Sequence, residues 1–162
     1  MRILFFGVNA LREIGKKSRK RMYCLSQLKR SGLGTQELIQ FYRTCIRPLT
    51  GYACPVFHDS LPKYLSEELE RIQRRAMRVI FPFKPYQEAL ALAGLETLSA
   101  RRQSLTNKSF SKITEDRNNK LHALLPERNI CHYNLRKKRK FKAYFKTNRL
   151  KNSFLLSNAL KL

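Results

Sequence analysis

Apolar residues recur at three- and four-residue steps along several segments of the chain, which is the pattern of amphipathic helices. The first such segment, residues 12–31, is strongly basic and carries its apolar residues at Ile14, Met22, Leu25 and Leu28. We expect it to form a helix with one buried stripe. Gly32 and Gly34 follow it and break the pattern.

A second helix is predicted to begin after these glycines, with Thr35 as its N-cap. Its apolar positions are Leu38, Ile39, Tyr42, Ile46 and Leu49. Pro48 is expected to kink or end this helix, because proline lacks an amide hydrogen and its ring clashes with the preceding turn. Residues 51–62 follow as a loop-rich connector.

The clearest helical pattern runs from about Ser66 to Ile80. Acidic residues occupy its start and arginines its end, the order that the helix dipole favours. Arg71, Arg75 and Arg78 share one face at positions i, i+4 and i+7. Two interpretations of this face carry equal weight: a surface that tracks a phosphate backbone, or a basic face exposed to water.

The segment 81–85 contains two prolines and separates this helix from a short one, Tyr86 to Ala93, which ends at Gly94. Thr97 or Ser99 can cap a further helix that extends to about Ile113. No strand-like alternation of useful length occurs. The predicted fold class is therefore mainly α, a small helical bundle.

The segment from Arg128 to the C-terminus differs from the rest, because it holds eleven basic residues, no acid and no periodic core pattern. Such a segment cannot balance its charge internally. We expect a basic, largely irregular tail that stays extended until it meets a polyanion.

The net charge of the chain indicates the class of partner that it binds. The 162 residues include 34 Lys and Arg against 11 Asp and Glu, a formal net charge of +23. Lys and Arg that neutralise phosphates release condensed counterions, so a nucleic acid is the favoured partner. A solvated surface, a ribosomal-type scaffold role and an anionic membrane face are the alternatives.

The N-terminal segment, the lengths of the apolar runs and the cysteine pattern together predict an intracellular protein of the nucleus or cytoplasm. We expect it to be neither secreted nor bound to a membrane. The N-terminal apolar run is interrupted at Asn9, and no segment approaches the length of a membrane span. The four cysteines form no CxxC pair, which favours a reducing compartment.

The tail carries the most concentrated basic run, followed by the aromatic residues Phe141, Tyr144 and Phe145. The run consists of Arg136, Lys137, Lys138, Arg139 and Lys140. Cations interleaved with rings suit a phosphate backbone whose bases stack on the rings. The same run also matches a patch read by a nuclear import receptor, or a merely solubilising tail.

Signals for catalysis are missing from the sequence. The two aspartates, Asp59 and Asp116, lie far apart in the chain, whereas a polymerase or nuclease needs clustered carboxylates for two metal ions. Cys45, Cys54 and His58 could bind zinc only with a remote fourth ligand, Cys131 or His132, and buried thiols are the favoured interpretation. We expect no enzyme activity, no cofactor and no metal site.

Residues 18 to about 157 resemble the C-terminal part of the reverse transcriptase of LINE-type, non-LTR retrotransposons. The matching stretches include Lys20-Arg21-Met22-Tyr23, Ile46-Arg47-Pro48, Tyr52-Ala53-Cys54-Pro55-Val56-Phe57-His58, Glu70-Arg71-Ile72-Gln73-Arg74-Arg75-Ala76, Ala93-Gly94-Leu95, Leu124-Leu125-Pro126 and Tyr133-Asn134-Leu135-Arg136. Their order and spacing make the pattern specific. Two departures occur: Gly51 stands where the pattern has an acid, and the first fifteen residues do not continue it.

The resemblance implies the thumb and C-terminal extension, which grip the template-primer duplex after the palm domain. On this basis we expect an atypical opening (1–15), a helical thumb-like domain (16–114), a connector with a short helix (115–127) and the basic tail (128–162). The palm domain with its paired aspartates would be the missing packing partner.

Three functional hypotheses follow. The preferred one is a non-catalytic remnant of this transposable element's enzyme that binds RNA or an RNA–DNA template-primer duplex. The alternatives are the C-terminal part of an active RNA-directed DNA polymerase whose palm is lost from the gene model, and a non-functional pseudogene product. The expected duplex-facing residues are Tyr23, Lys29, Arg30, Arg71, Arg75 and Arg78, and the tail contact is Arg136 to Lys140.

Overall fold

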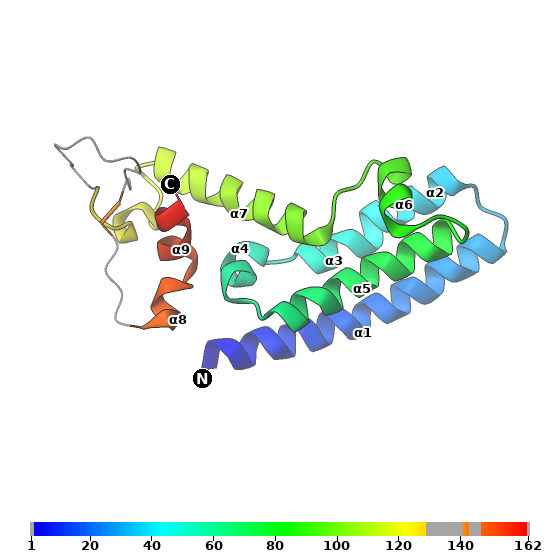
Figure 1. Cartoon of the computed structure of the whole chain (residues 1–162), viewed down its shortest axis with the longest axis horizontal. Helices are drawn as coiled ribbons and strands as arrows, with labels where there is room; N and C mark the ends of the chain where they lie inside the picture. The colour runs from blue at the N-terminus through cyan, green and yellow to red at the C-terminus, as the bar shows by residue number, and fades with distance from the viewer. Residues whose placement is uncertain (1, 129–140, 143–146, 162) are drawn as a thin grey trace. The chain divides into compact units, whose positions relative to one another are not determined.

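The computed structural model describes residues 2–128, 141–142 and 147–161, and it is mainly helical over these residues (Figure 1). The elements are α1 (Arg2–Arg30), α2 (Thr35–Phe41), the π-helical segment η1 (Tyr42–Ile46), α3 (Arg47–Gly51), α4 (Cys54–Phe57), the 3₁₀ segment η2 (His58–Ser60), α5 (Lys63–Ile80), α6 (Tyr86–Ala93), α7 (Leu98–Glu115), the 3₁₀ segment η3 (His122–Leu124), α8 (Asn148–Lys151) and α9 (Phe154–Lys161). The described residues form no strand, only an isolated bridge between Arg128 and Phe141. The predicted mainly-α class is confirmed.

The chain forms two compact units, which are described separately below. The first comprises residues 1–52 and 61–102, and the second comprises residues 53–60 and 103–162. No helix in the described part of the chain is long and apolar enough to cross a bilayer.

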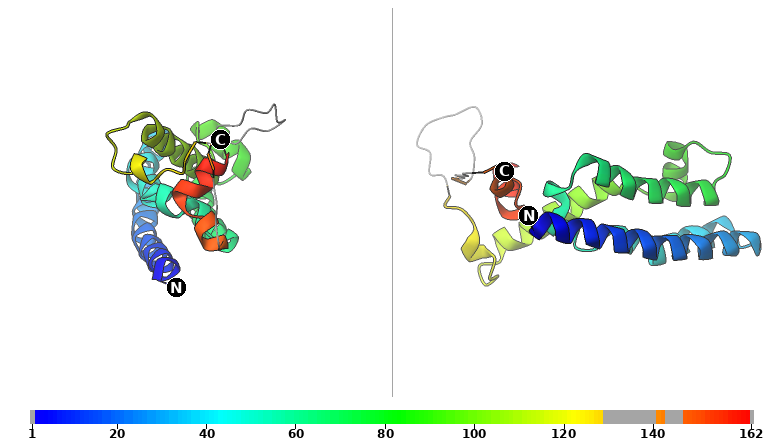
Figure 2. Two further views of the ribbon diagram at one scale, coloured as in Figure 1. Left: turned by 90° about the vertical axis from the view of Figure 1, so that its left-hand side faces the viewer. Right: turned by 90° about the horizontal axis from the view of Figure 1, so that it is seen from below.

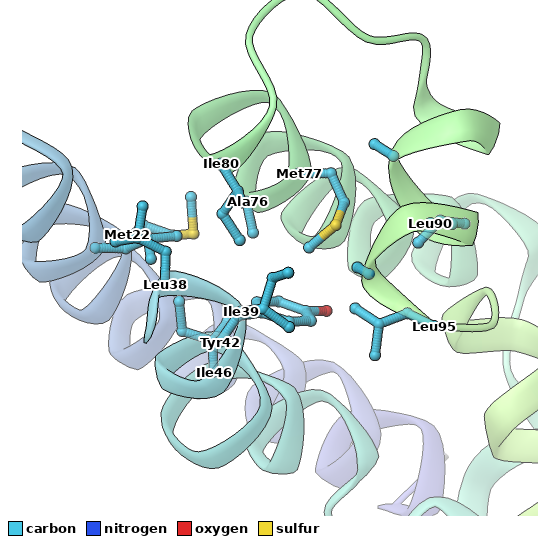
Figure 3. Packing of buried hydrophobic residues seen from close by; sticks show 13 residues of the cluster. Met22, Leu38, Ile39, Tyr42, Ile46, Ala76, Met77, Ile80, Leu90 and Leu95 are labelled. Atoms are coloured by element: carbon cyan, nitrogen blue, oxygen red, sulfur yellow. The ribbon is translucent and has the colours of Figure 1, made fainter. Parts of the chain in front are cut away.

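In the first unit, α1 packs against α5, and the two helices run in the same direction (Figures 1 and 2). The segment α2–η1–α3 returns in the opposite direction beside them (Figure 1). The apolar stripes of these elements and of α6 meet in one core (Figure 3). Its buried residues are Met22, Leu25, Leu38, Ile39, Tyr42, Ile46, Ala76, Met77, Ile80, Ala89, Leu90, Ala93 and Leu95.

Figure 3 shows how side chains at helical spacing meet in this core. Leu38, Ile39 and Tyr42 lie on one face of the α2–η1 segment and point toward Ala76 and Met77 of α5. Residues three and four positions apart share a helix face, so each stripe is buried as a unit. Of the core positions expected in residues 22–46, Leu28 is partly buried at the edge of the core. The others are buried: Met22, Leu25, Leu38, Ile39, Tyr42 and Ile46.

Most predicted helices are present, with shifted boundaries. Helix α1 begins at Arg2, ten residues before the predicted start, and α5 begins at Lys63 rather than near Ser66. Helix α6 has the predicted bounds, and Thr97 caps α7 by accepting a hydrogen bond from the Ala100 amide at 3.2 Å.

Two predictions about the second helix are corrected. Thr35 is the first helical residue rather than the N-cap, a position that Gly34 occupies without a side-chain hydrogen bond. Of the two outcomes expected for Pro48, a kink or an end of the helix, the end is wrong, since Pro48 lies in the first turn of α3 after the π-helical segment. Proline is tolerated there because first-turn amides need no partner within their own helix.

The expected loop-rich connector 51–62 is also partly helical, since it contains α4 and η2. Proline at the start of α4 presets the helical backbone angle, which favours a short helical turn there. Ala53 immediately before it adopts a left-handed conformation with φ 52°.

The second unit has a small core of its own around Phe110, Phe141 and Ala159. The rings of Phe110 and Phe154 pack edge to face, with centroids 6.1 Å apart. Asp59 anchors α9, because its carboxylate accepts hydrogen bonds from Asn158 at 2.9 Å and Lys161 at 2.6 Å.

The prediction that the chain after Arg128 is extended is wrong over residues 148–151 and 154–161, which form α8 and α9. Phe154, Leu155 and Ala159 of α9 pack on the Phe110 cluster, and Phe141 is buried in it. Tertiary burial of these apolar side chains stabilises a helix that is too short to be stable alone. Residues 129–140 and 143–146 lie outside the described residues.

Two glycines of the first unit should respond in opposite ways to alanine. Gly94 ends α6 with φ +59°, where a side chain is strained, and a Cβ there would lie 3.3 Å from the Arg43 Nη2. We expect Gly94→Ala to lower the free energy of unfolding by about 1–2 kcal/mol. Gly15 lies inside α1 with open space around its Cβ position, so Gly15→Ala should raise stability by about 0.5–1 kcal/mol.

Urea denaturation followed by circular dichroism measures both effects on the full chain. Stabilisation by Gly94→Ala, or destabilisation by Gly15→Ala, would contradict the backbone conformation described for these two positions.

Candidate nucleic-acid interface

Basic side chains from α1 and α5 line the same surface of the first unit. On α1, Arg19, Tyr23 and Arg30 lie at i, i+4 and i+11, which brings them to one side of the helix. On α5, Arg71, Arg75 and Arg78 lie at i, i+4 and i+7. Because α1 packs against α5, the two basic faces border a common groove.

Three adjoining hollows make up this groove, and Arg75 lines all of them. The first, of about 360 Å³, is lined by Arg19, Met22, Tyr23, Ser26, Gln27, Arg30 and Arg75. The second, of about 320 Å³, is lined by Gly15, Ser18, Arg19, Met22, Glu68, Arg71, Ile72 and Arg75. The third, of about 430 Å³, is lined by Arg71, Arg74, Arg75, Arg78 and Val79. We call this surface the arginine groove, and its arginines are Arg19, Arg30, Arg71, Arg74, Arg75 and Arg78.

The arginine groove carries positive charge that the protein itself does not neutralise. In the described part of the chain, the ion pairs join Lys16 to Glu13, Arg47 to Glu96, Lys84 to Glu88, Lys142 to Glu127 and Lys161 to Asp59. None of them involves an arginine of the groove, and Glu68 is the one acid that lines it. Clustered cations without counter-charges concentrate a positive potential where an anion can enter.

One arginine of the groove has an aromatic partner. The Arg74 guanidinium lies 5.6 Å from the centre of the Tyr86 ring, a cation–π arrangement. Its charge is retained in this arrangement, so Arg74 still contributes to the potential of the groove.

Behind the groove, a buried polar network fixes the rotation of α5. Gln73 is fully buried, and its Oε1 accepts a hydrogen bond from the Tyr42 hydroxyl at 2.6 Å. The Gln73 amide donates to the Tyr86 hydroxyl at 3.1 Å and to the Glu96 carbonyl at 2.9 Å. Holding Gln73 on the inner side of α5 keeps Arg71 and Arg75 on its outer side.

The network continues through Tyr86, whose hydroxyl donates to Glu70 Oε1 at 2.5 Å. The Glu70 carboxylate also accepts the Leu98 amide at 3.1 Å, which attaches the start of α7 to α5. Burial raises the pKa of Tyr42. Burial, followed by the hydrogen bond to Glu70, raises the pKa of Tyr86. Both hydroxyls therefore keep their protons and remain donors at neutral pH.

The structure brings most of the predicted duplex-facing residues together. Tyr23 and Arg30 line the first hollow, Arg71 lines the second and third, and Arg78 lines the third. All four side chains are exposed, and Tyr23 is 66% exposed. Whether they bind nucleic acid remains a prediction.

Lys29 is half-buried and does not line the hollows, because its position on α1 turns it away from Arg30. The tail residues Arg136 to Lys140 lie outside the described residues, and their role stays a prediction.

Sequence reasoning missed two arginines of the groove, Arg19 and Arg74. Arg19 precedes Tyr23 by four residues, so the helical spacing could have identified it. The same spacing could have identified Arg74, which lies three residues after Arg71 and four before Arg78 on α5.

The described cysteines and aspartates considered above as metal ligands or catalytic groups are buried, partly buried or engaged in hydrogen bonds. Cys54 is buried and Cys45 half-buried, and no group of three or more His, Cys, Asp or Glu side chains forms a metal site among the described residues. Asp59 binds α9, and Asp116 Oδ1 accepts the Asn118 amide at 2.9 Å in a turn.

Comparison of the chain with protein-family models, with curated proteins and with solved structures finds no match.

Proposed function

We propose that this chain binds RNA or an RNA–DNA template-primer duplex through the arginine groove, without catalysis. The observation that carries the proposal is the gathering of six arginines from two helices around one groove that has a single acid in its lining. Arginine suits this task, because its planar guanidinium matches phosphate oxygens with two parallel hydrogen bonds.

The spacing of the arginines on α5 supports a polymer of phosphates over a single anion. Arg71 and Arg78 are seven residues apart, which is about 10.5 Å along a helix axis. Successive phosphates of one B-DNA strand are about 3.4 Å apart along the duplex axis, so a row of this length exceeds one phosphate and suits several. A merely solvated basic face would not require cations from two helices to converge.

The wider proposal follows from the resemblance to LINE-type reverse transcriptases. In this proposal residues 16–114 are the thumb-like domain that grips the duplex, and the chain is a remnant of that enzyme. The missing palm domain is the partner that such a thumb packs against. The basic run Arg136 to Lys140 would add a second contact to nucleic acid or bind a nuclear import receptor, consistent with a protein of the nucleus or cytoplasm.

A salt titration of filter binding tests the proposal. Six phosphate contacts predict a slope of log K against log salt of about −5 for a duplex of RNA and DNA. A slope near zero would overturn the proposal, because it would mean that no phosphate is neutralised.

A primer-extension assay with Mg²⁺ or Mn²⁺ distinguishes the polymerase alternative. We expect no DNA synthesis by the purified chain, because the aspartates it holds serve local structure. Metal-dependent synthesis would instead favour the polymerase alternative, as would an in-frame paired-aspartate motif in the genomic sequence just upstream. Circular dichroism without helical minima in the absence of nucleic acid would favour the pseudogene alternative.

A further inference from the structure

The first hollow of the arginine groove differs chemically from the third. The third is lined by four arginines and Val79, and its polar groups are all cations. The first combines arginines with an aromatic ring, a thioether, a hydroxyl and an amide. We call the first hollow the nucleotide pocket, lined by Arg19, Met22, Tyr23, Ser26, Gln27, Arg30 and Arg75.

Its cations come from both helices. Arg19 and Arg30 stand eleven residues apart on α1, and Arg75 enters from α5. No carboxylate lines this hollow, and none of these arginines takes part in an ion pair of the described residues. The pocket can therefore hold at least one phosphate with charge-assisted hydrogen bonds.

Its apolar part suits a flat ring. Tyr23 is 66% exposed, so the faces of its ring remain accessible, while Met22 beside it is 7% exposed and belongs to the hydrophobic core. Nucleobases stack on aromatic side chains and on guanidinium planes. Because Met22 is fixed by core packing, this lining of the pocket is preformed.

Its polar part suits the edge of a base. The Gln27 side-chain amide has no hydrogen-bond partner in the described part of the chain, so it offers a donor and an acceptor. The Ser26 hydroxyl donates to the Met22 carbonyl at 3.0 Å, which leaves its oxygen free to accept. The oxygens of a phosphodiester only accept hydrogen bonds, whereas the edge of a base presents both donors and acceptors, so the free acceptors of Gln27 and Ser26 suit a base.

From these observations we infer that the nucleotide pocket takes one unpaired nucleotide of RNA or DNA, with its base against Tyr23 and its phosphate at Arg75 and one of the two α1 arginines, Arg19 or Arg30. The volume of about 360 Å³ falls in the range of about 300–1,000 Å³ for small-ligand sites. A paired base is stacked inside its duplex and cannot enter, so the chain should prefer a duplex that carries an unpaired nucleotide. This inference rests on the proposed function.

Fluorescence anisotropy with three matched RNA–DNA duplexes tests the inference on the full chain. One duplex is blunt, one carries a single-nucleotide overhang, and one carries the same overhang as an abasic nucleotide, with overhangs placed at the 5′ or the 3′ end of either strand. The abasic overhang has the same phosphate charge but no base. We expect the complete nucleotide to bind at least about fivefold more tightly than the abasic one at one or more ends.

Two variants test whether the preference for the complete over the abasic overhang depends on the nucleotide pocket. Tyr23→Ala should abolish the difference between the complete and abasic overhangs, and Gln27→Met should reduce it. Tyr64→Ala replaces an exposed tyrosine outside the groove and should preserve it. Because Tyr23 is exposed, its replacement should leave the circular dichroism spectrum unchanged.

The outcomes separate this inference from the proposed function. Equal affinity for the complete and abasic overhangs at every end, with a steep salt dependence, would overturn the nucleotide pocket but leave phosphate binding intact. A preference retained in Tyr23→Ala would also overturn the pocket. A salt slope near zero for all three duplexes would overturn the proposed function itself.

Discussion

Replacing Arg71, Arg75 and Arg78 together with alanine is expected to weaken binding of an RNA–DNA duplex by about a hundredfold at physiological salt. Each phosphate contact contributes about 0.9 to the slope of log K against log salt, so losing three lowers the slope by about 2.7. These side chains are exposed on α5 and line adjoining hollows, so their removal should leave the fold intact. Filter binding at several salt concentrations measures both quantities.

The matched control removes the same amount of charge elsewhere. Lys108, Lys112 and Lys120 are exposed cations that do not line the arginine groove. Their replacement by alanine should change the salt slope by less than about one. Equal weakening by both triple variants would mean that net charge, rather than the groove, governs binding.

Gln73→Leu is expected to lower the free energy of unfolding by about 2–4 kcal/mol. The amide is buried and serves three partners: the Tyr42 hydroxyl, the Tyr86 hydroxyl and the Glu96 carbonyl. Leucine has a similar size but leaves these polar groups without their hydrogen bonds, which is costly in a buried site. Urea denaturation of the full chain measures this change in the free energy of unfolding.

Two further variants show whether the network is the cause. Combining Tyr42→Phe with Gln73→Leu removes one orphaned hydroxyl and should recover part of the lost stability. Gln87→Leu alters an exposed glutamine on α6 and should change the free energy of unfolding by less than about 0.5 kcal/mol. A cost below 1 kcal/mol for Gln73→Leu would show that the network does not hold α5 in place.

The elements that could be predicted from sequence are those whose signals are local. Helix α6 has the expected bounds because Pro85 precedes it and Gly94 can adopt the left-handed conformation that ends it. Helix α9 could not be predicted, because its stability depends on Phe110 and Phe141, residues distant in the chain, and on the ion pair of Lys161 with Asp59.

The same distinction applies to the candidate site. Helical spacing predicts that Arg71, Arg75 and Arg78 share a face, and it could have added Arg19 to Tyr23. Spacing within one helix does not show which other helix lies beside it. The pairing of α1 with α5, which places Arg75 next to Tyr23 and Arg30, depends on the packing of the whole first unit.

Photocrosslinking tests most directly whether the arginine groove binds nucleic acid. The full chain would be irradiated with an RNA–DNA duplex containing 4-thiouridine, digested with trypsin and analysed by mass spectrometry. Cleavage after Arg21 and Lys29 releases residues 22–29, which include Tyr23. We predict crosslinks to this peptide that disappear in the Arg71, Arg75 and Arg78 triple variant. Crosslinks confined to peptides outside α1 and α5 would contradict the account.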